Sequence, residues 1–425
     1  MGSPSLAIDG GDALRRNPWP AWPRVTQATE DAILDAVRAG RWAISGTYTG
    51  EPPYERRFGE AFARYHEVDY CVPTCNGSSA LVIALGGLGI GAGDEVLVPG
   101  LTWVGCATAV LRAGATPVLV DVDPATLCIS PDAAADAVTD RTAAIMAVHL
   151  YQSVADLEGL VELCERRGLA LIEDCAQAHG ARWRGRPVGS VGAIGTFSFQ
   201  VAKLLASGEG GATITSDPDL YDRLQQLRAD GRRWAAASVL GEMDLEQVGG
   251  VQGQNYCMSE FHAAVLLEGL SRLDAENATR RANFETLAGL LDGVDGVDVI
   301  FAPAEVEPVF YQLCLRLDPD AFGGDIEWAR RALSAELAIP VDRSYPPLND
   351  NPLYVPSRAT LIGPEVAAAS KPSSFELPVA EEAYRTCLCL PHTVLLGHAD
   401  DMRDIAAALE KVGSHASVET SVGGA

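Results

Sequence analysis

The stretch EVLVPGLTWVGCATAVLRAGATPVLVDVD, residues 95–123, contains the repeating unit that predicts the fold. It reads as an apolar strand (95–100), a helix (103–114) and a second apolar strand (116–123). The same alternation continues on both sides, from about residue 70 to 216. Apolar strands separated by helices of this length predict a mainly parallel α/β sheet. The strands expected at 193–200 and 211–216 are so close in sequence that one of them is expected to run antiparallel.

The length of 425 residues predicts more than one domain. We expect an N-terminal arm over 1–30, which contains the sequence PWPAWP, and a large domain over 31–275. A long helix, continuous or broken, is expected over 258–294, and a smaller C-terminal α/β domain over 276–412. The small polar residues of 413–425 predict a disordered tail.

Composition and charge exclude several classes of function. The formal net charge is −25, whereas nucleic acids and anionic membranes bind clustered positive charge. No apolar run approaches the roughly 20 residues that span a membrane. The ten cysteines contain no CxxC pair, and Cys387 and Cys389 are too close for a usual zinc site. We therefore expect no metal site, reduced thiols and a cytoplasmic protein.

Lys203 lies within FSFQVAKLLASGEGGA, residues 197–212, among apolar neighbours. Such a lysine is often a side chain that extends along an apolar surface to reach water. However, the chain has only three lysines among its 32 basic residues. Arginine stays protonated, whereas a lysine amine can lose its proton and attack a carbonyl. The choice of lysine here therefore indicates a chemical role.

Four features follow predicted strands and should meet at one edge of the sheet. The turn Asn76–Ser79 opens a helix and suits a phosphate, although it could be an ordinary helix cap. Asp174 ends an apolar strand and could pair with a pyridinium nitrogen or cap a turn. Trp103 offers a flat face for stacking or fills the core. Ser198 and Lys203 could address two parts of one ligand, and the GEGG that follows lets backbone pass close by.

Together these features fit pyridoxal 5′-phosphate: a phosphate turn, a stacking ring, an acid and an imine-forming amine. A competing interpretation is a dehydrogenase, because residues 87–92, GLGIGA, match a dinucleotide fingerprint. That fingerprint must follow a strand and open a helix, whereas this one follows a predicted helix.

The chain resembles the DegT/StrS group of sugar and cyclitol aminotransferases over about residues 15–412. The resemblance rests on TCNGSSAL, DEVLVPGLTWV, PVLVDVD, IEDCAQAHGA, GTFSFQVAK, SGEGGA and NYCMSEFHAA. It implies the type I aminotransferase fold, with a mostly parallel seven-stranded sheet in the large domain and a smaller C-terminal α/β domain. It also implies a homodimer with shared active sites.

The same resemblance assigns roles to individual residues. Lys203 would bind the cofactor as an imine and move the proton, Asp174 would hold the ring nitrogen, and Gln177 would bond the ring hydroxyl. The other roles are stacking by Trp103, phosphate binding by Gly77, Ser78 and Ser198, and a bond from Asn255 to the neighbouring subunit's phosphate.

Further shared stretches, including DVDPATLCIS, LRADGR, NPLY and DMRDIAAALEKV, resemble a subgroup of aminoglycoside antibiotic biosynthesis. That subgroup implies L-glutamine as the donor and a ketocyclitol such as 2-deoxy-scyllo-inosose as the acceptor. Val201, Ala202 and Gln152 depart from the expected pattern at positions expected to flank the active site. They leave scyllo-inosose, an amino-ketocyclitol and a nucleotide keto-sugar open. Two other interpretations of the function compete with this one. They are a dehydratase that forms 3-amino-5-hydroxybenzoate and a cofactor-binding regulator without turnover.

Overall fold

A seven-stranded sheet forms the centre of residues 5–422, the part of the chain that this computed structural model describes. Its order is β1-β9-β8-β5-β4-β2-β3. β9 runs antiparallel to β1 and β8, and all other pairs are parallel, as the sequence predicts. The strands are β1 (Tyr70–Thr74), β2 (Glu95–Pro99), β3 (Thr116–Val120), β4 (Thr142–Val148), β5 (Ala170–Asp174), β8 (Ile194–Ser198) and β9 (Gly211–Thr215).

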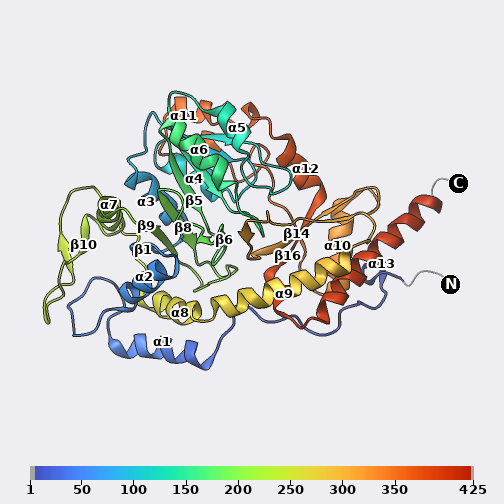
Figure 1. The fold of residues 1–425 in the computed structure, drawn as a ribbon, viewed down its shortest axis with the longest axis horizontal. Helices are drawn as coiled ribbons and strands as arrows, with labels where there is room; N and C mark the ends of the chain where they lie inside the picture. Colours follow the sequence, from blue (N-terminus) through green and yellow to red (C-terminus); the bar gives the residue numbers. More distant parts are fainter. Residues whose placement is uncertain (1–4, 423–425) are drawn as a thin grey trace.

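Helices cover this sheet because its strands are apolar on both faces (Figure 1). Several helices begin at a side-chain cap: Asn76 accepts a hydrogen bond from the Ser79 N–H at 2.8 Å, and Asp156 accepts one from Gly159 at 3.1 Å. The covering helices are α3 (Gly77–Gly87), α4 (Gly105–Arg112), α5 (Pro131–Ala137), α6 (Leu157–Arg167) and α7 (Pro218–Arg228).

Four further helices lie in the lower part of Figure 1, where α8 is between α1 and α2 and α9 continues from α8. They are α1 (Gln27–Ala39), α2 (Tyr54–Tyr65), α8 (Glu260–Leu270) and α9 (Leu273–Leu291). α1 and α2 both pack against α8. The predicted long helix is broken between α8 and α9, at Ser271 and Arg272. α9 then carries the chain from the first core to a second one.

The second core is built on an antiparallel sheet of order β12-β14-β16-β15. The N-terminal arm packs here: Leu6 is fully buried in this core, and Arg15 bonds the carboxylates of Asp401 and Asp404 at 2.5 and 2.7 Å. The elements are β12 (Val297–Val299), β14 (Gln312–Leu317), β15 (Asp342–Arg343), β16 (Cys387–Pro391), α10 (Ile326–Leu337) and α13 (Asp401–Val422).

The expectation of a disordered tail from residue 413 is wrong for the first residues of that segment, which continue helix α13. α13 continues to Val422, and residues 423–425 lie outside the described residues. The physical reason is packing: Val412 and Ala416 lie on the buried face of the helix, and Gly413 approaches the ring of Phe322. The small polar composition of this segment therefore did not prevent the start of it from packing as a helix.

The C-terminal half contributes to both cores, so the predicted boundary at residue 276 stays a prediction. Leu348, Tyr354 and Leu377 belong to the core of the large sheet. The remaining elements are α11 (Pro364–Ala369), α12 (Pro378–Thr386), β6 (Arg182–Trp183), β7 (Arg186–Pro187), β10 (Arg232–Trp234), β11 (Leu245–Gln247), β13 (Val306–Glu307), η1 (Ala7–Asp9), η2 (Pro356–Arg358), η3 (Pro372–Ser374) and η4 (His392–Leu396). Within residues 5–422, no helix combines the length and apolarity needed to cross a bilayer.

Candidate active site

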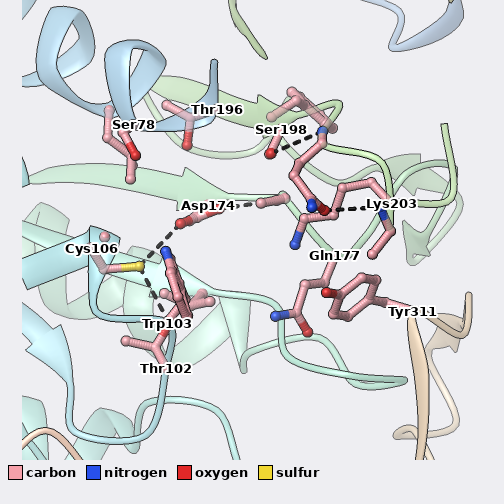
Figure 2. A pocket seen from close by; sticks show the side chains of 18 of the residues that line it. Ser78, Thr102, Trp103, Cys106, Asp174, Gln177, Thr196, Ser198, Lys203 and Tyr311 are labelled. Carbon is pink, nitrogen blue, oxygen red and sulfur yellow. Dashed lines mark hydrogen bonds between the residues drawn. The ribbon is translucent and has the colours of Figure 1, made fainter. Parts of the chain in front are cut away.

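A cavity of about 470 Å³ opens at the carboxyl ends of β1, β2, β5 and β8. Because these strands are parallel, the residues that follow them reach the same edge of the sheet. Figure 2 shows the side chains that face the cavity. Seven of the eight predicted site residues line it: Gly77, Ser78, Trp103, Asp174, Gln177, Ser198 and Lys203. The eighth, Asn255, is exposed and does not line this cavity, so its predicted reach into a neighbouring subunit stays a prediction.

Lys203 directs its amine into the cavity instead of extending to the surface. Its Nζ lies 4.1 Å from the centre of the Tyr311 ring. Burial lowers the pKa of the Lys203 amine to about 8, against the opposing effects of Asp174 and Cys106. The uncharged amine, which is the form able to attack a carbonyl, is therefore more abundant near neutral pH than in an ordinary lysine.

Asp174 ends β5 and is 5% exposed at the floor of the cavity. Its Oδ1 accepts a hydrogen bond from Ala176 N–H at 3.0 Å, which is the local capping role that the sequence left open. Its Oδ2 accepts one from the Cys106 thiol at 3.2 Å. Burial and the Asp174 charge raise the pKa of that thiol well above its ordinary value, so Cys106 keeps its proton and donates. The carboxylate is thus held in one orientation and retains lone pairs for a cationic ligand group.

The predicted phosphate turn lies where α3 approaches β8 and β9. Asn76 caps α3, and the remaining first-turn N–H groups have no partner within the helix. A Cβ on Gly77 would lie 2.7 Å from Cβ of Ser198, and one on Gly211 would lie 2.4 Å from the Asn76 carbonyl oxygen. The glycines therefore let three backbone segments meet, which places Gly77, Ser78 and Ser198 around one helix N-terminus suited to an anion.

Trp103 forms a flat wall of the cavity, and Gln177 forms a polar one. Trp103 is 53% exposed and lines the cavity, so the interpretation of a core tryptophan is wrong. A Cβ on Gly105 would lie 2.8 Å from the indole, and this glycine therefore gives the ring its room. Gln177 accepts from Tyr151 N–H at 2.8 Å and donates to the Tyr345 hydroxyl at 3.2 Å. These bonds fix its amide at the cavity wall.

The sequence analysis missed several lining residues. Tyr311, Gln312, Asp342 and Tyr345 come from the C-terminal half of the chain, and Cys106 from the first turn of α4. No strand-end signal marks the C-terminal four, because packing of distant segments brings them here. The sequence could have predicted Cys106, because it follows Trp103 by three residues at the start of a helix and residues at that spacing lie on the same face.

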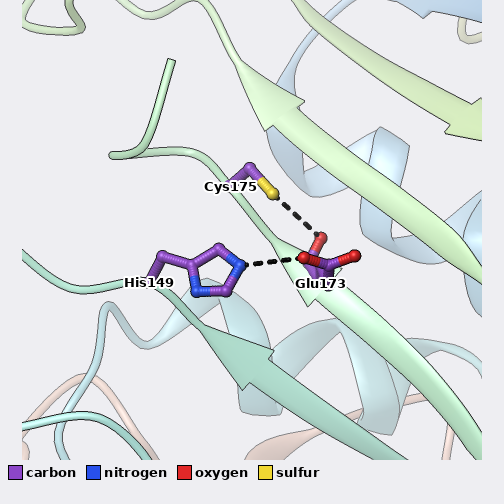
Figure 3. Close-up of side chains that lie close together, drawn as sticks. All are labelled: His149, Glu173 and Cys175. Carbon is purple, nitrogen blue, oxygen red and sulfur yellow. Dashed lines mark hydrogen bonds and ion pairs between the residues drawn. The ribbon is translucent and has the colours of Figure 1, made fainter. Parts of the chain in front are cut away.

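His149, Glu173 and Cys175 lie together as a buried cluster, and hydrogen bonds account for it (Figure 3). His149 accepts from Ala155 N–H at Nδ1 and bonds Glu173 at 3.1 Å through Nε2. Glu173 also accepts N–H bonds from Gly189, Val191 and Gly192. Burial raises the pKa of Glu173, but the bonds from His149 and these N–H groups outweigh it and lower the pKa. The carboxylate thereby anchors the loop that leads into β8.

Two of the positions that depart from the family pattern do not line the cavity. Gln152 is 2% exposed and bonds the carbonyls of Ile300 and Cys314, so its expected place beside the active site is wrong. Val201 is exposed outside the cavity, whereas Ala202 lines it. Gln152 therefore serves to join two parts of the chain, and Ala202 is the departure that faces a ligand.

The model of the DegT/DnrJ/EryC1/StrS aminotransferase family matches residues 27–410. The chain belongs to this family. The L-glutamine:2-deoxy-scyllo-inosose aminotransferase of Streptomyces kanamyceticus is 47% identical over 98% of each chain. The L-glutamine:scyllo-inosose aminotransferase of Streptomyces griseus is 46% identical over 96% of this chain and 97% of its own.

Among solved structures, the crystal structure of 3-amino-5-hydroxybenzoic acid synthase superposes with a TM-score of 0.80. It covers 95% of this chain and 100% of that chain, at 29% identity. These relatives confirm the predicted family and the type I aminotransferase fold. The dehydrogenase interpretation is wrong, because residues 87–92 connect the end of α3 to β2.

Proposed function

We propose that this aminotransferase uses pyridoxal 5′-phosphate to transfer the amino group of L-glutamine to a ketocyclitol in aminoglycoside antibiotic biosynthesis. The first candidate acceptor is 2-deoxy-scyllo-inosose. The observation that carries the proposal is the Lys203 amine, buried in a cavity with Asp174 and a helix N-terminus. The chain also matches enzymes named for this reaction over nearly their full length.

The residues present fit the cofactor. Gly77, Ser78 and Ser198 would hold its phosphate at the start of α3, Trp103 would cover one face of its ring, and Asp174 would pair with its ring nitrogen. When bound, the group supplies an aldehyde for the amine and a cationic ring that takes up electrons. Gln177 would bond the ring hydroxyl, as the family resemblance implies.

The chain's own part in the reaction is to hold the ring and to move a proton. Lys203 is the only cationic side chain among the described residues that line the cavity. Its lowered pKa lets the free amine take a proton from the donor Cα in the first half-reaction. In the second half-reaction, which runs the transfer in reverse, the same amine delivers a proton to the acceptor carbon. Cys106 and Ala176 N–H hold the Asp174 carboxylate in place while this occurs.

A polyhydroxylated acceptor suits the polar residues that line the rest of the cavity. Glu209, Tyr311, Gln312 and Asp342 present acceptors and donors there. Hydroxyl groups can bond to carboxylates, amides and phenols without a charge of their own. These residues support a cyclitol and give no cationic site for the diphosphate of a nucleotide sugar.

We further propose a homodimer in which each subunit completes the other's site. α1 exposes Ile33, Leu34 and Val37, and Trp42 follows, 55% exposed. Leu240 and Met243 add apolar surface on a segment bonded to residues 46–48. Such a surface favours a protein partner, and Asn255 would reach the neighbouring phosphate.

The same proposal places the enzyme in the cytoplasm. All ten cysteines lie in the described residues and are unpaired, which fits a reducing compartment.

The test of function is an acceptor screen with L-glutamine, followed by mass spectrometry. The panel contains 2-deoxy-scyllo-inosose, scyllo-inosose, an amino-ketocyclitol and a nucleotide keto-sugar. We expect amination of 2-deoxy-scyllo-inosose to be fastest. A preference for the nucleotide sugar, or release of an aromatic product from a dehydrating substrate, would overturn the proposed acceptor.

A further inference from the structure

The backbone immediately before Lys203 is bound by two aromatic rings from distant segments. The Trp22 indole Nε1–H donates to the carbonyl oxygen of Val201 at 2.9 Å. The ring of His392, in η4, lies close to the backbone carbonyl of Ala202. The two rings touch edge to face, with centres 4.6 Å apart. Each of the two carbonyls that precede the amine-bearing residue therefore faces a ring from outside the loop.

Arg280 determines which nitrogen of His392 can donate. This arginine is fully buried in α9, and its Nη2 lies 3.3 Å from Nδ1 of His392. A guanidinium can only donate, so Nδ1 accepts and the ring proton resides on Nε2. The Arg280 guanidinium also lies 5.4 Å from the centre of the Trp22 ring. One buried cation thus aligns both rings.

A chain of hydrogen bonds through Asn277 and His179 also connects the Arg280 guanidinium to Ser198, at the other end of the loop. Arg280 Nη1 donates to Asn277 Oδ1 at 2.9 Å, and Asn277 Nδ2 donates to the carbonyl oxygen of His179 at 2.9 Å. His179 in turn bonds the carbonyl oxygen of Ser198 through Nε2 at 2.9 Å. The loop from Ser198 to Lys203 is therefore supported at both ends from α9.

We propose that Trp22 and His392, aligned by Arg280, are positioning residues that set where the Lys203 amine enters the cavity. The inference rests on the proposed role of Lys203 as the residue that binds the cofactor. Without the two ring donors, the carbonyls of Val201 and Ala202 lose their partners and the loop can rotate. The amine then spends less time directed at a carbonyl in the cavity.

The experiment measures how fast the cofactor-free enzyme forms its covalent adduct with pyridoxal phosphate. Adduct formation is followed by absorbance, and borohydride reduction with peptide mass mapping locates it. Trp22→Phe keeps the ring contact but removes the N–H donor, and loss of one such bond predicts adduct formation about fivefold slower. Trp19→Phe is the matched control, because Trp19 makes a similar bond to Leu337 at 2.8 Å in the same arm. It should react like the wild type.

A second pair of variants tests the same point at His392. Gln at this position can present a donor near Nε2, whereas Leu cannot, so His392→Gln should retain the rate better than His392→Leu. The melting temperature of each variant is measured as well, because a general structural role would lower it. Rates are compared only between variants that keep the same melting temperature. Wild-type rates in Trp22→Phe and His392→Leu would overturn the positioning role and leave the proposed function intact. Absence of an adduct on Lys203 in the wild type would instead overturn the proposed function itself.

Discussion

Replacing Gly77 with alanine tests whether close approach of α3 to β8 builds the phosphate site. The new Cβ would lie 2.7 Å from Cβ and 3.2 Å from Cα of Ser198. Carbon atoms pack at about 3.5–4.0 Å, so the two segments must separate by about 1 Å. Overpacking of this kind costs about 1–3 kcal/mol. The helical preference of alanine offsets about 0.5–1 kcal/mol of that.

We therefore expect Gly77→Ala to lower the free energy of unfolding by about 0–2.5 kcal/mol. The shift also withdraws the first-turn N–H groups from the phosphate. Loss of even one hydrogen bond to a charged group should weaken cofactor binding about tenfold or more. Urea unfolding of the cofactor-free protein and fluorescence titration with pyridoxal phosphate measure the two effects.

The matched control is Gly289→Ala in α9, where an added Cβ meets no atom within 4 Å. This variant should gain about 0.5–1 kcal/mol of stability and keep wild-type cofactor affinity. Wild-type cofactor affinity in Gly77→Ala would refute the close approach as the basis of the site.

The remaining predictions concern the amine and one buried ion pair. Lys203→Arg should retain the fold by circular dichroism but lose transamination, because arginine cannot form the imine, and substantial turnover would contradict the assignment. The rate of adduct formation should rise as pH increases through about 8, where the Lys203 amine loses its proton; a midpoint near the ordinary lysine value would contradict the burial argument. Glu55→Ala leaves the buried Arg228 guanidinium without its carboxylate and should cost about 3–5 kcal/mol in urea unfolding. The exposed pair of Glu162 and Arg166 is its control, and Glu162→Ala should cost about 0–0.5 kcal/mol; equal losses would show that burial does not matter.

Local sequence signals were sufficient for the large sheet and for most of the site. Apolar strands followed by a polar or turn residue predicted where Asp174, Trp103 and the Asn76 turn would lie, because parallel strands share one carboxyl edge. The short connection between β8 and β9 likewise predicted the antiparallel strand. These features depend on a few consecutive residues, so they can be identified along the chain.

The features that the sequence did not predict depend on contacts between distant segments. Tyr311 and Tyr345 reach the cavity only because the C-terminal half packs beside it. Gln152 resembled a cavity residue by its position in a motif, yet its amide bonds the backbone of β14. Trp22 lies 179 residues from its carbonyl partner at Val201, and no local pattern predicts that bond.

The central claim is that this cavity moves the α-amino group of glutamine to a ketocyclitol. The most direct measurement uses L-glutamine with heavy nitrogen on its α-amino group, together with 2-deoxy-scyllo-inosose and pyridoxal phosphate. We predict that mass spectrometry will detect the heavy nitrogen in the aminated cyclitol from the wild type, with an equal amount of the oxo acid. The Lys203→Arg variant should give neither product. An aminated cyclitol without the label, or equal turnover by that variant, would contradict the account.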